Sequence, residues 1–301
     1  MFEQGKVSPI IPIKLQPSIK ADVALYLLRL DLTDEYVSGN KWFKLKYNLN
    51  DALLLKRKSV LSFGGAFSNH IHALAWAGKK LGIKTVGVIR GEPEYASNPT
   101  LTDAARWGME LLFVSRSEYR KRNEIEFVEA LKRQFDDPLI IPEGGSNHLA
   151  VKGASEIVTK SMLDQYGFNH IVLPCGTGGT LAGVAVSQPE VSVLGVPVLK
   201  GAEFLVSDIQ ELMSGARCSD PGNWSLDYSG HCGGYGKTSK ELIDFIEQFH
   251  CDHNVSLDQI YTGKMMMRLF QLIENGAFSK GSKILAIHTG GLQGLRSLST
   301  S

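Results

Sequence analysis

The feature that most constrains this fold is a repeated unit in which an apolar run ends directly in a glycine-rich loop. Four such loops occur, at 64–65, 144–145, 176–179 and 290–291. Short apolar runs alternate with segments of helical periodicity along the chain, which is typical of parallel sheets covered by helices on both faces. Because ligands bind outside the carboxyl ends of the strands in open α/β sheets, the four loops predict one shared ligand cleft.

The apolar runs and the helical periodicity predict where the elements lie. We expect strands at about 23–30, 59–63, 85–89, 110–114, 138–141, 170–174, 191–196 and 284–287. We expect helices from Lys41 onward and at about 69–81, 102–107, 117–135, 148–166, 181–187, 202–213, 239–250 and 264–275. The proline-punctuated residues 1–20 are predicted to form an extended arm, and 220–236 an irregular segment.

Composition excludes several classes of partner. With 301 residues and a net charge of +1, the chain offers no strong attraction for nucleic acid or for an acidic membrane surface. No apolar run is long enough to span a bilayer, and the first residues lack the apolar stretch of a signal peptide. We therefore expect a cytoplasmic protein.

The four cysteines suit a reducing compartment and form no disulfide framework. His231-Cys232 and the run 250–253 supply types of residue that bind metals, but no paired CxxC accompanies them. A polar helix end is the preferred interpretation of the second run, and we predict no metal site.

The stretch that begins at Gly39 supplies a candidate nucleophile. Gly39-Asn40 is a turn pair, and Lys41 then opens an amphipathic helix in which Phe43 and Tyr47 lie four residues apart. The positive end of the helix dipole and any loss of water favour the neutral amine of Lys41, which Schiff-base chemistry requires. The plain alternative for this stretch alone is a surface lysine.

The loop 176–180 is the strongest signal for an anion. Its glycines let the backbone approach a phosphate closely, and Thr177 and Thr180 add hydroxyl donors. The loop lacks the GxxxxGK[ST] pattern of a nucleoside triphosphate site, and it matches the GxGxxG pattern of an NAD site only weakly. A glycine turn that only packs a strand on a helix is the alternative.

Two further groups are candidates for substrate contact. Ser68, Asn69 and His70 stand where a helix begins, so they could bind a carboxylate or could simply cap that helix. Tyr235 and Tyr261 each stand next to glycine or a small residue, and either could stack on a flat ring, transfer a proton or be half-buried packing residues. An aromatic aldehyde with one phosphate, pyridoxal 5′-phosphate (PLP), would use all of these parts.

The motif Ser38-Gly39-Asn40-Lys41-x-x-Lys44-Leu45 resembles the GGNKxRKLE motif of the 1-aminocyclopropane-1-carboxylate deaminase / D-cysteine desulfhydrase family of PLP enzymes. The resemblance extends from about residue 30 to 294. The other motifs of the family occur here in the same order, at 64–70, 142–146, 176–180, 235–236, 261–264 and 288–291.

This resemblance implies an α/β protein of PLP fold type II, with two open, mostly parallel twisted sheets that carry helices on both faces. It implies a small domain at 46–144 and a large domain built from 1–45 and 145–301, with the cofactor in the cleft between them. It also implies a homodimer that acts on a small amino acid.

The resemblance also assigns roles to residues of the cofactor site. Lys41 forms the Schiff base and acts as the base for the α-proton, and Asn69 contacts the 3′-oxygen of the cofactor. Tyr261 stacks on the pyridine ring, and Thr289 meets the pyridine nitrogen. The phosphate is held by the loop Gly176, Thr177, Gly178, Gly179 and Thr180.

On the substrate side, Ser68 with its neighbours Asn69 and His70 holds the carboxylate, and Tyr235 faces the substrate. The hydroxyl residues Thr262 and Thr289 resemble the desulfhydrase branch, because the true deaminases carry glutamate and leucine at these places. A neutral hydroxyl at the pyridine nitrogen leaves a weaker electron sink, which suffices for α,β-elimination from D-cysteine.

Alternatives stay open at this point. They are a 1-aminocyclopropane-1-carboxylate deaminase, a β-replacing synthase, a non-catalytic PLP-binding module and, least favoured, an NAD-dependent oxidoreductase. Phe43 stands where the family has a basic residue, and Lys237 where a turn-forming residue is expected. The substrate could therefore differ from both 1-aminocyclopropane-1-carboxylate and D-cysteine, the two substrates in the family name.

Overall fold

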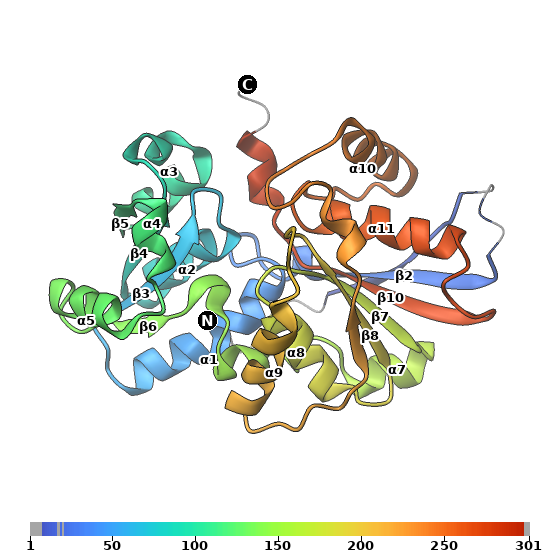
Figure 1. Cartoon of the computed structure of the whole chain (residues 1–301), viewed down its shortest axis with the longest axis horizontal. Helices are drawn as coiled ribbons and strands as arrows, with labels where there is room; N and C mark the ends of the chain where they lie inside the picture. Colours follow the sequence, from blue (N-terminus) through green and yellow to red (C-terminus); the bar gives the residue numbers. More distant parts are fainter. Residues whose placement is uncertain (1–7, 17–18, 20, 298–301) are drawn as a thin grey trace.

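The computed structural model describes residues 8–16, 19 and 21–297, and two β-sheets organise it. In Figure 1 the smaller sheet, made by the middle of the sequence, lies on the left, and the larger sheet lies on the right. The prediction of an α/β fold with two mostly parallel sheets is confirmed.

The larger sheet combines the two ends of the described chain. Its strands are β1 (Ile10–Ile13), β2 (Val23–Arg29), β10 (Ser282–His288), β7 (His170–Cys175), β8 (Ser192–Pro197) and β9 (Trp224–Leu226), in that spatial order. Only the pairing of β1 with β2 is antiparallel. The long sequence separation between neighbouring strands, such as β2 and β10, brings distant loops to one edge.

The smaller sheet is entirely parallel. Its spatial order is β5 (Met109–Val114), β4 (Lys84–Arg90), β3 (Ser59–Gly65) and β6 (Leu139–Ile141). The strands of this sheet all lie within the predicted small domain. The boundaries at 45/46 and 144/145 stay a prediction.

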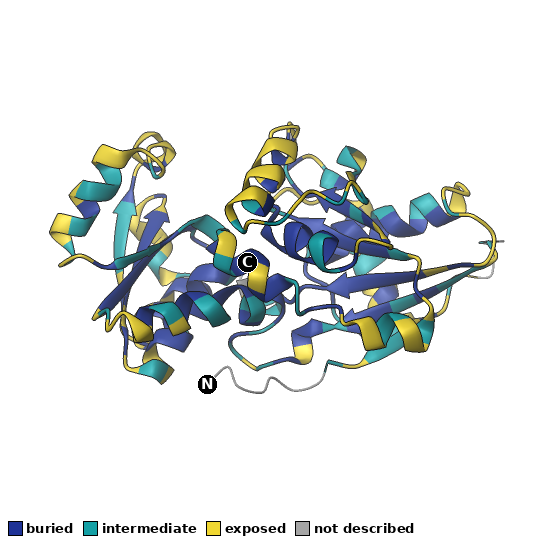
Figure 2. Cartoon of the chain, turned by 90° about the horizontal axis from the view of Figure 1, so that it is seen from below, coloured by how far each residue is buried: buried dark blue, intermediate teal, exposed yellow. Residues whose placement is uncertain are grey.

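Helices cover both faces of both sheets. They are α1 (Asn40–Leu54), α2 (Asn69–Leu81), α3 (Pro99–Arg106), α4 (Arg116–Arg120), α5 (Ile125–Gln134), α6 (His148–Ala154), α7 (Lys160–Tyr166), α8 (Gly179–Ser187), α9 (Leu205–Gly215), α10 (Lys240–His253) and α11 (Thr262–Glu274). The alternation of side chains along a strand sends neighbours such as Val60 and Leu61 into different cores on opposite faces of the sheet. Figure 2 shows the buried strands between helices whose outer sides are exposed.

Most predicted elements lie where the sequence placed them, but two long helices are each divided in two. The helix expected over 117–135 is interrupted between α4 and α5, and Arg122 in that interruption reaches Glu143. The helix expected over 148–166 breaks before Thr159, whose side chain caps α7 by accepting a hydrogen bond from the backbone of Met162. The periodicity alone predicts two continuous helices. One break coincides with the side-chain cap at Thr159, and the other contains Arg122, which pairs with Glu143.

Two short edge strands were not predicted. β1 lies within the expected extended arm, and β9 lies within the expected irregular segment. Each adds to one edge of the larger sheet, so their structure depends on pairing with β2 and β8 rather than on local pattern. Among the helices that the structure describes, none is long and apolar enough to cross a membrane.

The packing of α1 on α6 depends on a glycine and gives a test of the fold. A Cβ atom built on Gly153 of α6 would lie 1.9 Å from the backbone carbonyl oxygen of Phe43 in α1. We expect Gly153→Ala to lower the free energy of unfolding by about 1–3 kcal/mol, measured by urea denaturation, because the two helix backbones must separate.

The matched control is Gly215→Ala at the end of α9, where the added methyl group meets no atom within 4 Å. This variant should be as stable as the wild type or up to about 1 kcal/mol more stable. A Gly153→Ala protein as stable as the control would contradict the close contact of α1 with α6.

Candidate active site

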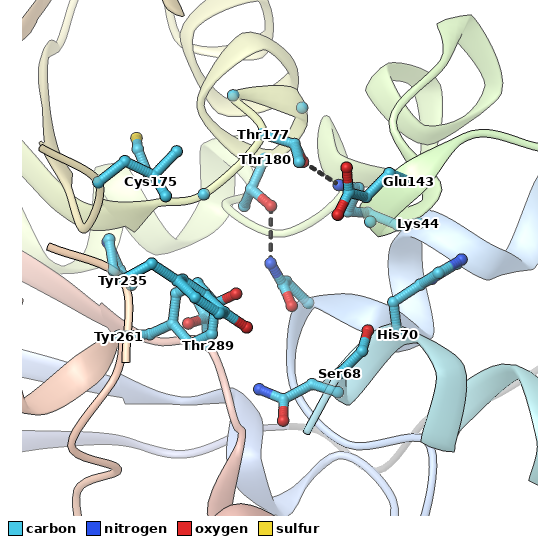
Figure 3. A pocket seen from close by; sticks show the side chains of 18 of the residues that line it. Lys44, Ser68, His70, Glu143, Cys175, Thr177, Thr180, Tyr235, Tyr261 and Thr289 are labelled. Carbon is cyan, nitrogen blue, oxygen red and sulfur yellow. Dashed lines mark hydrogen bonds between the residues drawn. The ribbon is translucent and has the colours of Figure 1, made fainter. Parts of the chain in front are cut away.

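A cavity of about 280 Å³ lies between the two sheets and is lined by loops that follow β3, β7 and β10. Figure 3 shows Thr177 and Thr180 on one wall, Tyr235, Tyr261 and Thr289 on another, and Ser68 and His70 on the side of α2. The lining includes these residues that the sequence singled out for the cofactor and substrate sites: Lys41, Ser68, Asn69, His70, Gly176, Thr177, Gly178, Gly179, Thr180, Tyr235, Tyr261 and Thr289.

The position of Lys41 is fixed by a close backbone approach. Gly39 precedes α1 with φ of 70°, and a Cβ atom there would lie 2.0 Å from the carbonyl oxygen of Thr289. The backbone N–H of Asn40 donates to the same carbonyl over 3.3 Å. Only glycine combines a positive φ with the absence of a Cβ atom. Gly39 therefore lets the first turn of α1, which carries Lys41, contact the carboxyl end of β10.

The amine of Lys41 is poised between its two protonation states. Burial lowers its pKa to about 8, and the carboxylate of Asp258 opposes this effect. Its Nζ donates to Oδ1 of Asn40 over 3.1 Å. A substantial fraction of Lys41 is therefore neutral near pH 8, as the sequence analysis anticipated for a lysine at a helix N-terminus.

Lys44 is a functional candidate that the sequence analysis quoted but did not assign. Its side chain is 2 % exposed, and Nζ donates to Oγ of Ser146 over 2.7 Å and to Oγ1 of Thr177 over 3.5 Å. Burial and then the charge of Lys41 hold the pKa of Lys44 well below its usual value. Its spacing of three residues from Lys41 places both amines on one helix face, and this signal could have revealed it.

The surroundings of Lys44 have the character of an anion site. Oγ1 of Thr180 accepts from Asn40 over 2.8 Å, which leaves the Thr180 hydroxyl proton for a further acceptor. A Cβ atom on Gly179 would lie 3.1 Å from Nζ of Lys44, so the glycine gives the amine access to the first turn of α8. Within the described residues, no carboxylate pairs with Lys44. One phosphate group on the loop 176–180 would supply the missing charge.

Ser68 serves the helix as well as the cavity. Its side chain caps α2 by accepting a hydrogen bond from the backbone N–H of Ile71 over 3.3 Å. Ser68 is therefore a helix cap, which was one of the two roles predicted for it. Ser68 also lines the cavity, as its predicted binding role requires. The side-chain oxygen of Asn69 accepts from Gln293, which orients the Asn69 amide from the far end of the chain.

His70 is buried and neutral. Its Nε2 lies 2.7 Å from Oγ of Ser62, which itself donates to the carbonyl of Ile141 over 2.7 Å. His70 therefore donates from Nε2, and Nδ1 is an acceptor that has no partner among the described residues. Burial and then the charges of Lys41 and Lys44 hold the pKa of His70 well below its usual value.

The two tyrosines form an edge-on pair, with ring centroids 6.1 Å apart. A Cβ atom on Gly176 would lie 3.2 Å from the ring of Tyr261, so this glycine admits the ring beside the loop 176–180. Burial raises the pKa of the Tyr261 phenol well above its usual value, which keeps the hydroxyl protonated at neutral pH. Tyr235 is 36 % exposed, and partial desolvation of its phenol raises its pKa as well.

Supporting residues fix these rings. Oδ2 of Asp258 accepts from the backbone of Tyr261 over 2.8 Å, and Oδ1 accepts from the Thr262 hydroxyl over 2.6 Å. Thr262 is fully buried and is not part of the cavity lining, whereas Thr289 is. Nζ of the buried Lys264 donates to the carbonyl of Gly234 over 2.7 Å and thereby ties the loop of Tyr235 to α11. Neither Asp258 nor Lys264 was predicted to act in the site.

Comparison with known proteins agrees with this geometry. A family profile described as pyridoxal-phosphate dependent enzyme matches residues 4–290. The chain belongs to this family. The hydroxyl groups around Lys44, the amine of Lys41 and the aromatic wall suit a cofactor that combines a phosphate, an aldehyde and a flat ring. The prediction of a PLP-dependent enzyme is confirmed.

Its relatives carry both names that the sequence analysis considered. A putative 1-aminocyclopropane-1-carboxylate deaminase from Pyrococcus furiosus is 32% identical, over 94% of this chain and 90% of that protein. The bifunctional mitochondrial D-cysteine desulfhydrase/1-aminocyclopropane-1-carboxylate deaminase from Arabidopsis thaliana is 29% identical, over 93% and 75%. A D-cysteine desulfhydrase from Yersinia pestis is 29% identical, over 90% and 87%.

A solved structure supports the same assignment to the deaminase/desulfhydrase family. The crystal structure of an ACC deaminase homologue is 30% identical and superposes with a TM-score of 0.82, over 97% of this chain and 93% of that one. The predicted membership of the deaminase/desulfhydrase family and the predicted fold type II are confirmed.

The depressed pKa of Lys41 can be tested without turnover. In the cofactor-free protein, acetylation of Lys41 by trace acetic anhydride should follow its neutral fraction, with a midpoint near pH 8. Exposed lysines in the same sample should follow a midpoint near the usual value of about 10.4. Peptide mass spectrometry across a pH series measures both. A Lys41 midpoint above pH 10 would contradict the burial of its amine.

Proposed function

We propose that this protein is a PLP-dependent lyase that converts a small D-amino acid, as a D-cysteine desulfhydrase does, to a 2-oxo acid and ammonia. With D-cysteine, one water is consumed, and pyruvate, ammonia and hydrogen sulfide are formed. The observation that carries the proposal is the placement of the Lys41 amine, with its pKa of about 8, in one cavity with the anion site around Lys44.

When bound, the cofactor supplies an electron-withdrawing ring that stabilises negative charge on the α-carbon of the amino acid. We assign its phosphate to the loop 176–180 and to Lys44, whose hydroxyl partners leave its charge unpaired. Lys41 would anchor the aldehyde, and Tyr261 would cover the ring beside Gly176. Asn69, oriented by Gln293, would contact the 3′-oxygen, and Thr289 would contact the pyridine nitrogen.

On the substrate side, the first turn of α2 offers backbone N–H groups and the Ser68 hydroxyl to the α-carboxylate, in the manner of an anion at a helix N-terminus. The Asn69 amide completes this wall, and His70, whose ring proton is given to Ser62, contributes its backbone N–H in the first turn of α2. The Lys41 amine would accept the α-proton, a role that a pKa near 8 favours. Tyr235 faces the β-substituent and carries a proton that it can donate.

The hydroxyl of Thr289 supports the desulfhydrase branch. A neutral hydroxyl at the pyridine nitrogen would leave the ring a weak electron sink, and elimination of a good leaving group makes only a small demand on the ring. The second candidate is a 1-aminocyclopropane-1-carboxylate deaminase, which the names of the Pyrococcus relative and of the structural neighbour favour. The predicted homodimer, the cytoplasmic location and the two domain boundaries belong to the same proposal.

The test is to supply PLP-loaded protein with D-cysteine, L-cysteine and 1-aminocyclopropane-1-carboxylate in separate assays. We expect pyruvate and sulfide from D-cysteine, and a loss of at least about a thousandfold in Lys41→Ala, because the proton acceptor is removed. Formation of 2-oxobutyrate from the cyclopropane substrate, without pyruvate from D-cysteine, would favour the second candidate. Product that requires an added nucleophile would instead indicate a β-replacing synthase.

A further inference from the structure

Arg90 places an unpaired guanidinium in the wall of the cavity. It is the last residue of β4 and lies beside Gly65 in the parallel ladder with β3. A Cβ atom built on Gly65 would lie 3.6 Å from a terminal nitrogen of Arg90, so the guanidinium lies over this glycine. The carbonyl of Gly65 accepts from the backbone N–H of Ser68 over 3.0 Å. Arg90 therefore packs on the turn that presents Ser68.

The second arginine in the cavity wall, Arg122, differs from Arg90 because its charge is already paired with a carboxylate. Nε of Arg122 lies 2.8 Å from a carboxylate oxygen of Glu143. The other acidic residue in the lining, Asp208, also interacts with Arg122, whose charge opposes the rise in the Asp208 pKa that burial causes. Among the residues that the structure describes, no carboxylate lies within ion-pair distance of Arg90.

The guanidinium groups of Arg90 and Arg122 both lie over the ring of Tyr119. Their central carbons lie 5.5 Å (Arg90) and 5.2 Å (Arg122) from the ring centroid of the buried Tyr119. A cation–π contact orients a guanidinium without occupying its hydrogen-bond donors. Arg90 is thus held in the cavity wall with its donors available to a ligand, while those of Arg122 are partly used by Glu143.

We propose that Arg90 determines substrate specificity by binding a second anionic group, so that the substrate is an amino acid with an acidic side chain or an acidic β-substituent. This inference rests on the proposed function, since Ser68 and the start of α2 are taken to hold the α-carboxylate. The planar guanidinium pairs with a carboxylate through two parallel hydrogen bonds. D-cysteine and 1-aminocyclopropane-1-carboxylate lack such a second carboxylate, so both are incomplete substrates.

The experiment measures binding through the absorbance of the bound cofactor, which does not depend on turnover. PLP-loaded protein is titrated with aspartate and asparagine, each as the D and the L enantiomer. The two amino acids are nearly isosteric and lack a good β-leaving group, so they differ mainly in the side-chain charge. We expect wild-type protein to bind aspartate at least about tenfold more tightly than asparagine.

Arg90→Gln should bring the ratio of the two dissociation constants close to one while leaving the value for asparagine within about threefold. Arg90→Lys should restore part of the preference. The matched control is Arg120→Gln, which removes the same charge from the exposed end of α4 outside the cavity lining and should keep the wild-type ratio. The PLP content of each variant checks that it is folded.

Two results would overturn the inference alone. One is equal affinity of the wild type for aspartate and asparagine. The other is an equal loss of affinity for both amino acids in Arg90→Gln, which would assign Arg90 to the α-carboxylate. A loaded protein whose absorbance responds to none of these amino acids, and which also forms no product from D-cysteine, would overturn the proposed function together with the inference.

Discussion

The site depends on the backbone contact between Gly39 and the Thr289–Gly290 segment. This contact leaves no room for a side chain at residue 39, since a Cβ atom there would lie 2.0 Å from the Thr289 carbonyl oxygen. It fixes the N-terminus of α1 to the larger sheet. The apolar face of the same helix, with Trp42, Leu45 and Leu49, packs into a core of the smaller sheet. One helix therefore holds Lys41 and Lys44 in the cavity and joins the two sheets around it (Figure 1).

Two lysines one helical turn apart in a buried site oppose folding through desolvation and mutual repulsion. Burial lowers the pKa of Lys41, burial and then the charge of Lys41 lower the pKa of Lys44, and burial and then both charges lower the pKa of His70. A bound phosphate would offset the cost at Lys44, and the neutral fraction of the Lys41 amine would be available to an aldehyde. The electrostatics of the cavity thus favour an anionic aldehyde over a ligand that lacks either group, and they link the stability of the protein to its cofactor.

Much of the fold and of the candidate site could be predicted from the sequence, because both depend on local pattern and short motifs. The apolar runs before the glycine loops predicted the parallel strands, and Gly39-Asn40-Lys41 predicted where α1 begins. Features that depend on partners distant in sequence were not accessible. β1 and β9 depend on pairing with β2 and β8 at the edges of the larger sheet. Asp258 and Lys264 are recognised only through burial and through the atoms they bind, whereas the helical spacing of Lys44 from Lys41 was a usable signal. Arg90 becomes distinctive only once Arg122 is found paired with Glu143.

The measurement that tests the central claim most directly is the chemical identity of the residue to which PLP is attached. The loaded protein is reduced with borohydride, digested and analysed by peptide mass spectrometry. The account predicts a pyridoxyl group on Lys41, with Lys44 unmodified, and no stable adduct in Lys41→Ala. Attachment to Lys44 or to a lysine outside the cavity, or an unchanged adduct in Lys41→Ala, would contradict the assignment of Lys41 as the anchor on which the proposed chemistry rests.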